Sequence, residues 1–144
     1  MEKIKTFVKQ FCEFDIPARR IGRRYYLVSD ELWNLKDTIK RDIFSLGTFL
    51  GENKDKFYPS LALLEIIAKK TDKKVMLNEK ASWLFLCKRE VFVENLIEGK
   101  EQTGLVLVQN ERNENLGYGV MKRVRQKLLL KPVLDRGDFL RRES

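Results

Sequence analysis

The spacing of apolar residues changes along this chain, and that change limits the possible folds more than any other feature. Before Cys87, most apolar residues recur three or four apart, as they do on the buried face of a helix. After Cys87 they cluster in short runs that Gly, Asn and charged turns separate, and these runs predict β-strands. The runs are residues 91–97, 105–108, 116–122 and 128–134. A chain that ends in this way is expected to form a small barrel or pseudobarrel there.

The first half of the chain predicts helices together with a few short strands. Apolar stripes predict helices at residues 2–12, from a cap at Ser29 and Asp30 to near Gly47, and around residues 63–70. Extended runs at residues 14–17 and 24–28 predict a hairpin with Gly22 at its turn, and residues 57–61 predict a short strand.

A polar segment at residues 71–74 is the best candidate for a domain junction, and it would divide the chain into residues 1–72 and 73–144. Beyond it, residues 75–77 predict a strand. Asn78 is then expected to cap a short apolar helix at residues 79–87.

The chain is basic, with 29 Lys and Arg against 21 Asp and Glu and a formal net charge of +8. This balance favours a polyanionic partner, most often nucleic acid. The cations gather in residues 119–131, which contain no acid; they are Lys122, Arg123, Arg125, Lys127 and Lys131. If one strand continued through this run, Arg123, Arg125 and Lys127 would share a face, with Lys122 opposite.

Most enzyme chemistry is absent from the sequence. There is no histidine, which removes the common nucleophile systems, the commonest general base and nearly all zinc sites. The glycines at 47–51 and 117–119 do not have the spacing of a phosphate-binding loop. Asp30 is better explained as a helix cap, and Asp135 as part of a turn beside Gly137. We therefore expect no catalytic residue, no metal site, no cofactor and no small-molecule substrate.

Two cysteines, Cys12 and Cys87, lie far apart among apolar neighbours, so we expect buried free thiols in a reducing compartment. No apolar run is long enough to span a membrane, and the first residues lack the apolar core of a signal peptide. These features predict a cytoplasmic protein, or a nuclear or nucleolar one in a eukaryote.

Six aromatic residues occupy periodic apolar positions and are expected in the core: Phe7, Phe11, Trp33, Phe57, Trp83 and Phe85. Tyr118 is the aromatic residue least expected there, because it lies between Gly117 and Gly119. The two glycines themselves predict close packing at a bend or bulge.

Five sequence blocks resemble the ribosome-biogenesis proteins of archaea and eukaryotes often called the Nip-seven family. They occur in that family's order and at compatible spacings, and together they extend over roughly residues 24 to 143. The blocks are YYLVS at 25–29, SLGTFLG at 45–51, KVML at 74–77, LGYGV at 116–120 and DRGDFLR at 135–141.

The resemblance implies an α+β fold. An N-terminal antiparallel sheet with flanking helices would form residues 1–72, and a C-terminal PUA pseudobarrel would form residues 73–144. It also implies a non-catalytic factor in large-subunit assembly and pre-ribosomal RNA maturation. The expected partners are RNA, either an rRNA precursor or a uridine-rich single strand, and other ribosome assembly proteins.

PUA domains bind RNA through a basic face, so the cations of residues 119–131 are the first candidate RNA contacts. Arg141 and Arg142 in the closing block are further candidates, for an RNA contact or for a structural ion pair. Arg19, Arg20, Arg23 and Arg24 in the first hairpin could bind RNA too. They could equally pair with Asp15, Asp30 or Glu31.

Two other functions remain open on the sequence alone. The chain could be an RNA-modifying enzyme or a detached specificity module of one, because PUA domains often accompany pseudouridine synthases and methyltransferases. It could also be a protein-interaction adaptor whose charge serves only solubility.

Overall fold

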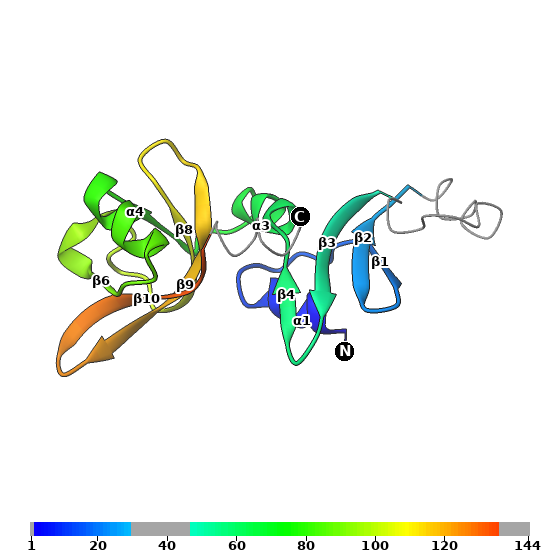
Figure 1. The fold of residues 1–144 in the computed structure, drawn as a ribbon, viewed down its shortest axis with the longest axis horizontal. Coiled ribbons are helices and arrows are strands. Elements are labelled where there is room, and N and C mark those ends of the chain that lie inside the picture. Colours follow the sequence, from blue (N-terminus) through cyan, green and yellow to red (C-terminus); the bar gives the residue numbers. More distant parts are fainter. Residues whose placement is uncertain (1, 30–46, 136–144) are drawn as a thin grey trace.

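The computed structural model describes residues 2–29 and 47–135, which form two sheets with helices between and beside them (Figure 1). The helix predicted between residues 30 and 46 lies outside the described residues. Arg141 and Arg142 lie outside them as well.

The chain begins with helix α1, Lys3–Lys9, whose apolar stripe is buried as predicted. A hairpin follows, made of β1 (Ala18–Ile21) and β2 (Arg24–Leu27). The hairpin was predicted, but its first strand was placed too early, at residues 14–17. The reason is the two-residue turn at Gly22 and Arg23, which pairs Ile21 with Arg24 and so fixes the register of the strands.

The first sheet is antiparallel throughout, in the order β1-β2-β3-β4. Its other two strands are β3, Thr48–Asn53, and β4, Phe57–Pro59. Helix α3, Leu61–Ala68, starts directly after β4, where Ser60 caps it. The Ser60 hydroxyl accepts a hydrogen bond from the Leu63 amide at 3.1 Å and donates one to the Phe49 carbonyl at 2.8 Å. The cap therefore also ties the helix to the sheet.

The second sheet has the order β6-β10-β9-β8-β5-β7 and curls into a nearly closed barrel, as predicted from the sequence. Its elements are β5 (Lys74–Leu77), α4 (Glu79–Leu86), β6 (Val91–Phe92), the 3-10 turn η2 (Val93–Asn95), β7 (Leu96–Glu98), β8 (Gly104–Gln109), β9 (Asn115–Val124) and β10 (Lys127–Asp135). Asn78 caps α4 as predicted, accepting a hydrogen bond from the Ala81 amide at 2.8 Å.

The run at 91–97 was predicted as one strand, but the structure divides it. Its first part, β6, pairs with β10, whereas its last part, β7, pairs with β5 at the other end of the strand order. The turn η2 joins the two parts. One straight strand cannot reach both edges of the sheet, so the run must break between β6 and β7.

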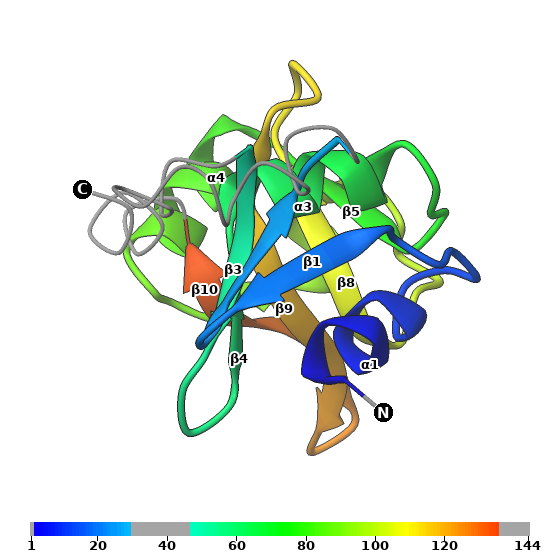
Figure 2. The same cartoon turned by 90° about the vertical axis from the view of Figure 1, so that its right-hand side faces the viewer.

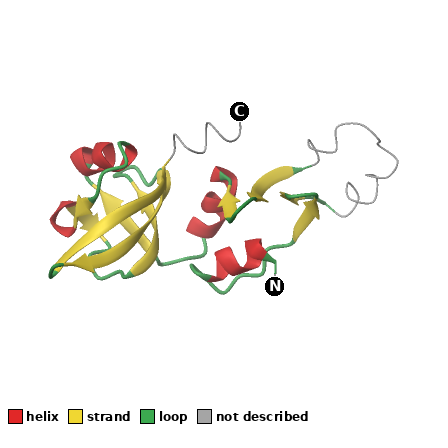
Figure 3. Ribbon diagram, turned by 60° about the horizontal axis from the view of Figure 1, so that its bottom comes forward, coloured by secondary structure: helices red, strands yellow, loops and turns green. Residues whose placement is uncertain are grey.

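The two halves of the chain share a core. Helices α1 and α3 lie between the two sheets (Figures 1 and 3), and Figure 2 shows the first sheet in front of β8 and β9. From the barrel side, Leu107, Tyr118 and Leu134 join the cluster that contains α1 and α3. The Tyr118 ring centroid lies 5.3 Å from that of Phe7 in an edge-to-face contact.

Tyr118 is only 4% exposed, so the aromatic residue that was least expected in the core lies in it. The expectation of close packing at its neighbouring glycines was right. A Cβ atom at Gly117 would overlap the carbonyl oxygen of Leu134, beside the irregular pairing between Pro132 and Leu134.

Of the other aromatic residues predicted in the core, four are buried, one lies outside the described residues and one is exposed. Phe7, Phe11, Phe57 and Phe85 are buried as expected, and Trp33 lies outside the described residues. Trp83 was wrongly assigned to the core, because it is 64% exposed.

Both cysteines are free thiols, but Cys87 is exposed and Cys12 is half-buried, so burial of both was wrong. Asp135 was expected in a turn, yet it is the last residue of β10 and is buried. Within residues 2–29 and 47–135, no helix is long and apolar enough to cross a membrane.

Candidate nucleic-acid interface

Strands β9 and β10 form a long hairpin whose turn projects at the end of the molecule farthest from β1 and β2 (Figure 1). The turn consists of Arg125 and Gln126, with φ of 51° and 68°. Both values lie in the left-handed region that a type I′ hairpin turn requires. The chain therefore reverses inside the basic run, in the interval between the two strands predicted at residues 116–122 and 128–134. Strand alternation carried through Arg125 consequently gives the wrong faces for these cations.

The reversal changes which cations share a face. Pairing sets Lys122 opposite Leu129, Lys127 opposite Val124 and Lys131 opposite Val120. Because paired residues share a face and faces alternate along a strand, these three lysines lie together on the outer face of the hairpin. We call Lys122, Lys127 and Lys131 the lysine face. Strand alternation in the sequence grouped Lys127 with Arg123 and placed Lys122 on the other face. In the structure Lys127 shares a face with Lys122, and Arg123 lies on the other face.

The two arginines of the run lie apart from the lysine face. Arg123 pairs with Leu128 on the other side of the hairpin, the side that continues into the barrel interior at Met121 and Leu130. It is exposed there and donates a hydrogen bond to the Gln126 carbonyl at 3.3 Å. Arg125 is exposed at the turn itself.

The charge of this hairpin is not compensated at contact distance. In the part of the chain that the structure describes, none of its five cations forms an ion pair. Carboxylates elsewhere are engaged with other cations, such as Asp135 with Lys88 at 3.6 Å. A surface of this kind attracts phosphates, because clustered charges of one sign add their fields.

The first hairpin is arranged differently. The Arg24 guanidinium lies 3.4 Å from the Glu52 carboxylate on β3 and 5.3 Å from the centroid of the Phe49 ring. The Tyr26 hydroxyl, and after it Glu52, raise the pKa of Arg24 above its ordinary value. Arg24 is thus part of the sheet's own packing.

Sequence reasoning named three nearby acids as partners of this hairpin and missed Glu52. Glu52 becomes the neighbour of Arg24 only through the β2–β3 register, which joins residues far apart in the sequence. Asp15, one of the acids named, pairs instead with Lys5 at 3.6 Å. The remaining cations, Arg19, Arg20 and Arg23, are exposed. They lie at the opposite end of the long axis from the lysine face (Figure 1), so the two basic groups do not form one surface.

Phe92 is a candidate contact residue that the sequence analysis missed. It lies directly opposite Leu129 in the β6–β10 pairing, and its ring is 47% exposed beside the lysine face. The Lys127 ammonium lies 5.5 Å from the ring centroid. The sequence held part of the information needed to find Phe92. Val91 and Phe92 are successive residues of a strand, so only one of them can point into the barrel.

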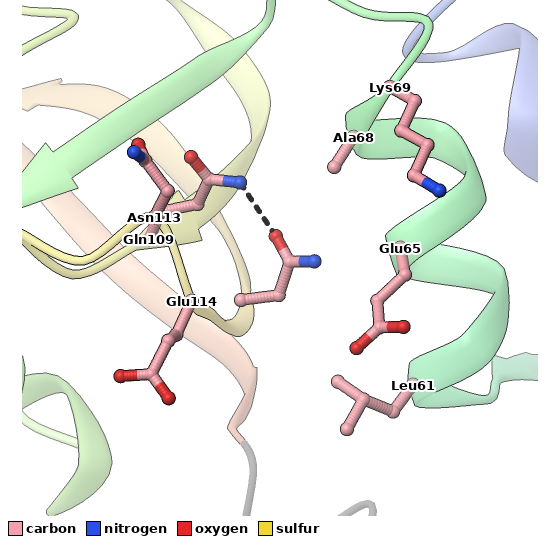
Figure 4. A pocket seen from close by; sticks show the side chains of 8 residues that line it. Leu61, Glu65, Ala68, Lys69, Gln109, Asn113 and Glu114 are labelled. Atoms are coloured by element: carbon pink, nitrogen blue, oxygen red, sulfur yellow. Dashed lines mark hydrogen bonds between the residues drawn. The ribbon is translucent and has the colours of Figure 1, made fainter.

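A groove of about 410 Å³ separates α3 from the β8–β9 turn (Figure 4). Its α3 side carries Glu65 and Lys69, and its barrel side carries Glu114 and a hydrogen bond of 2.9 Å from Gln109 to Asn115. With two carboxylates and one lysine, the groove is poorly suited to phosphate. Among the residues with described positions, no group of three His, Cys, Asp or Glu side chains could hold a metal ion.

Comparisons with known proteins extend over nearly the whole chain. The family model described as the UPF0113 PUA domain matches residues 73–144, and that of the NIP7/UPF0113 pre-PUA domain matches residues 1–61. No curated protein sequence is significantly similar. The fold is similar to that of a solved structure, a conserved PUA domain protein from Thermoplasma acidophilum. The two have a TM-score of 0.58 at 12% sequence identity, over 99% of this chain and 96% of that one.

Proposed function

Because this chain belongs to the NIP7/UPF0113 family of PUA-domain proteins, we propose that it is a non-catalytic RNA-binding factor of ribosome biogenesis. It would act in large-subunit assembly and precursor rRNA maturation, with other assembly proteins as partners. The observation that carries the proposal is the lysine face, three cations on one side of an exposed hairpin, to which no acid of residues 2–29 or 47–135 is paired.

The lysine face is better suited to contacting the phosphate backbone of RNA than to recognising a base sequence. A lysine ammonium acts as a compact point charge on a flexible stem, so it follows phosphates without fixed geometry. Phosphate contacts position a nucleic acid and contribute affinity, but they carry no sequence information. We therefore expect the hairpin to bind RNA of varied sequence with an affinity that falls steeply with salt.

Salt dependence measures how many phosphates the hairpin contacts. If the lysine face and Arg125 neutralise about four phosphates of a single strand, the slope of log affinity against log salt is about −3, at roughly −0.7 per contact. Raising the salt from about 50 to about 200 mM should then weaken binding on the order of 50-fold. Fluorescence anisotropy with a labelled oligouridylate of about 12 nucleotides measures this slope.

The deciding variant replaces Lys122, Lys127 and Lys131 together by glutamine, which keeps the stems and removes the charge. We expect its slope to be shallower by about 2 units, with weaker binding to all sequences. The matched control replaces Arg19, Arg20 and Arg23 by glutamine. It removes the same charge at the other end of the molecule and should keep the wild-type slope. Equal losses in both variants, or no loss in the lysine variant, would contradict the proposed surface.

The biological part of the proposal needs a test in cells. Crosslinking the protein to RNA and sequencing the recovered fragments should give reads concentrated on large-subunit rRNA and its precursors. Reads on transfer RNA would favour a role in RNA modification instead. Recovery of no RNA would favour a protein-interaction adaptor.

A further inference from the structure

The exposed ring of Phe92 is held in a defined position. On one side, Val91 is fully buried in the barrel core and anchors strand β6. On the other side, the backbone turns directly into η2, which begins at Val93. The ring therefore cannot move into the core without breaking the pairing of Val91 with Leu130 and of Phe92 with Leu129. It remains a fixed apolar surface that is about half open to solvent.

The surroundings of Phe92 are cationic. Lys122, Leu129 and Phe92 form one row across β9, β10 and β6, because Lys122 pairs with Leu129 and Leu129 with Phe92. Lys127 precedes Leu129 by two residues on β10 and therefore lies on the same face, with its ammonium near the Phe92 ring. Glu90 and Glu94 flank Phe92 in the sequence, but among the described ion pairs neither is joined to these lysines.

Proteins that bind single-stranded nucleic acid commonly do so through an aromatic ring surrounded by cations. Its phosphates contact the cations while an unpaired base stacks on the ring. A duplex cannot do this along its length, because its bases are already stacked on one another. A phenyl ring also has no hydrogen-bonding group, so it accepts any base through its π-face and does not select a sequence.

We propose that Phe92 is the stacking platform of this surface and that it makes the protein select unpaired RNA over duplex. One base would stack on Phe92, while the flanking phosphates contact Lys122 and Lys127. The lysine that now covers part of the ring can move to a phosphate, because only its flexible stem holds it there. The proposal rests on the proposed RNA-binding function and adds to it the residue that contacts an unpaired base.

Replacing Phe92 by leucine removes the π-face and keeps an apolar side chain opposite Leu129. We expect affinity for the oligouridylate to fall about 5- to 140-fold, which corresponds to 1–3 kcal/mol per stacked base at 1.4 kcal/mol per factor of ten. The salt slope should stay at its wild-type value, since no phosphate contact is lost. Binding to a duplex RNA of the same length should change little. Phe92→Trp should restore single-strand binding, because indole also stacks on bases.

Trp83→Leu is the matched control, because it removes another exposed aromatic ring, on α4, in the same way. It should bind RNA as the wild type does, and circular dichroism establishes that each variant is folded. If Phe92→Leu binds the single strand as tightly as the wild type while the triple lysine variant is defective, the stacking proposal is wrong and the RNA-binding function stands. If the wild type binds neither RNA, the proposed function fails first. An equal loss of single-strand and duplex binding would show that Phe92 only supports the fold of the hairpin.

Discussion

Replacing Phe7 by alanine tests whether the two halves of this protein unfold as one unit. Phe7 lies on α1 and contacts three rings, with centroid distances of 5.3 Å to Phe11, 5.4 Å to Phe57 and 5.3 Å to Tyr118. Removing a buried phenyl group usually costs about 3–5 kcal/mol, because a cavity remains. A typical native protein is stable by only about 5–15 kcal/mol. At about 3 °C per kcal/mol for a chain of this size, the Tm should fall by about 10–15 °C.

The location of the loss is more informative than its size. Because Tyr118 belongs to the barrel and Phe7 to the first half, a shared core predicts one cooperative transition. Amide hydrogen exchange should then show the same loss of protection in β8 and β9 as in α1. Thr6→Ala, on the exposed side of the same helix, should stay within about 0.5 kcal/mol of the wild type. The reasoning is refuted if Phe7→Ala exposes α1 while the amides of β8 and β9 keep their wild-type protection.

Two further predictions follow from the backbone and the thiols. Gly117→Ala should destabilise the protein in urea unfolding by clearly more than the roughly 1–3 kcal/mol typical of a backbone conformation reserved for glycine, because φ is +149° and the new Cβ would overlap the Leu134 carbonyl. Gly22→Ala, with a φ of +63° and open space around it, should cost only about 1–2 kcal/mol, and equal costs would contradict this explanation. Burial raises the pKa of the Cys12 thiol, so at about pH 8 less of it is the reactive thiolate. Peptide mass spectrometry after brief iodoacetamide treatment should therefore find Cys87 alkylated before Cys12, and the reverse order would show that the half-buried thiol is more accessible than its position indicates.

The features that the sequence predicted well depend on neighbouring residues. The stripe of α1 and the Asn78 cap of α4 need only residues within a turn or two of each other. Trp83 was misplaced because its spacing from the other apolar residues of the helix was not taken into account. It lies two residues from both Ala81 and Phe85, the buried residues of α4, and residues two apart on a helix do not share a face. Its exposure was therefore predictable from spacing alone.

The features that the sequence could not predict depend on distant contacts. Tyr118 lies on the same outer side of β9 as Lys122, but it is buried because residues of the first half of the chain, among them Phe7 and Phe11, pack against it. No local pattern carries that information. The grouping of the basic residues failed for another reason: the turn at Arg125 and Gln126 contains no glycine, so the sequence does not mark at which residues between 122 and 128 the chain reverses.

That same turn sets a limit on how the protein can be made more resistant to heat. A residue other than glycine in the left-handed region costs roughly 1–2 kcal/mol, and the preferred pair for such a turn is Asn-Gly. Engineering for stability would therefore choose Asn-Gly in place of Arg125 and Gln126 and would recover part of that cost. The same change would remove a cation from the end of the hairpin. Under the proposed function, thermal resistance and RNA affinity are thus opposing demands on Arg125. Selection for stability alone should replace it, whereas selection for RNA affinity alone should keep it.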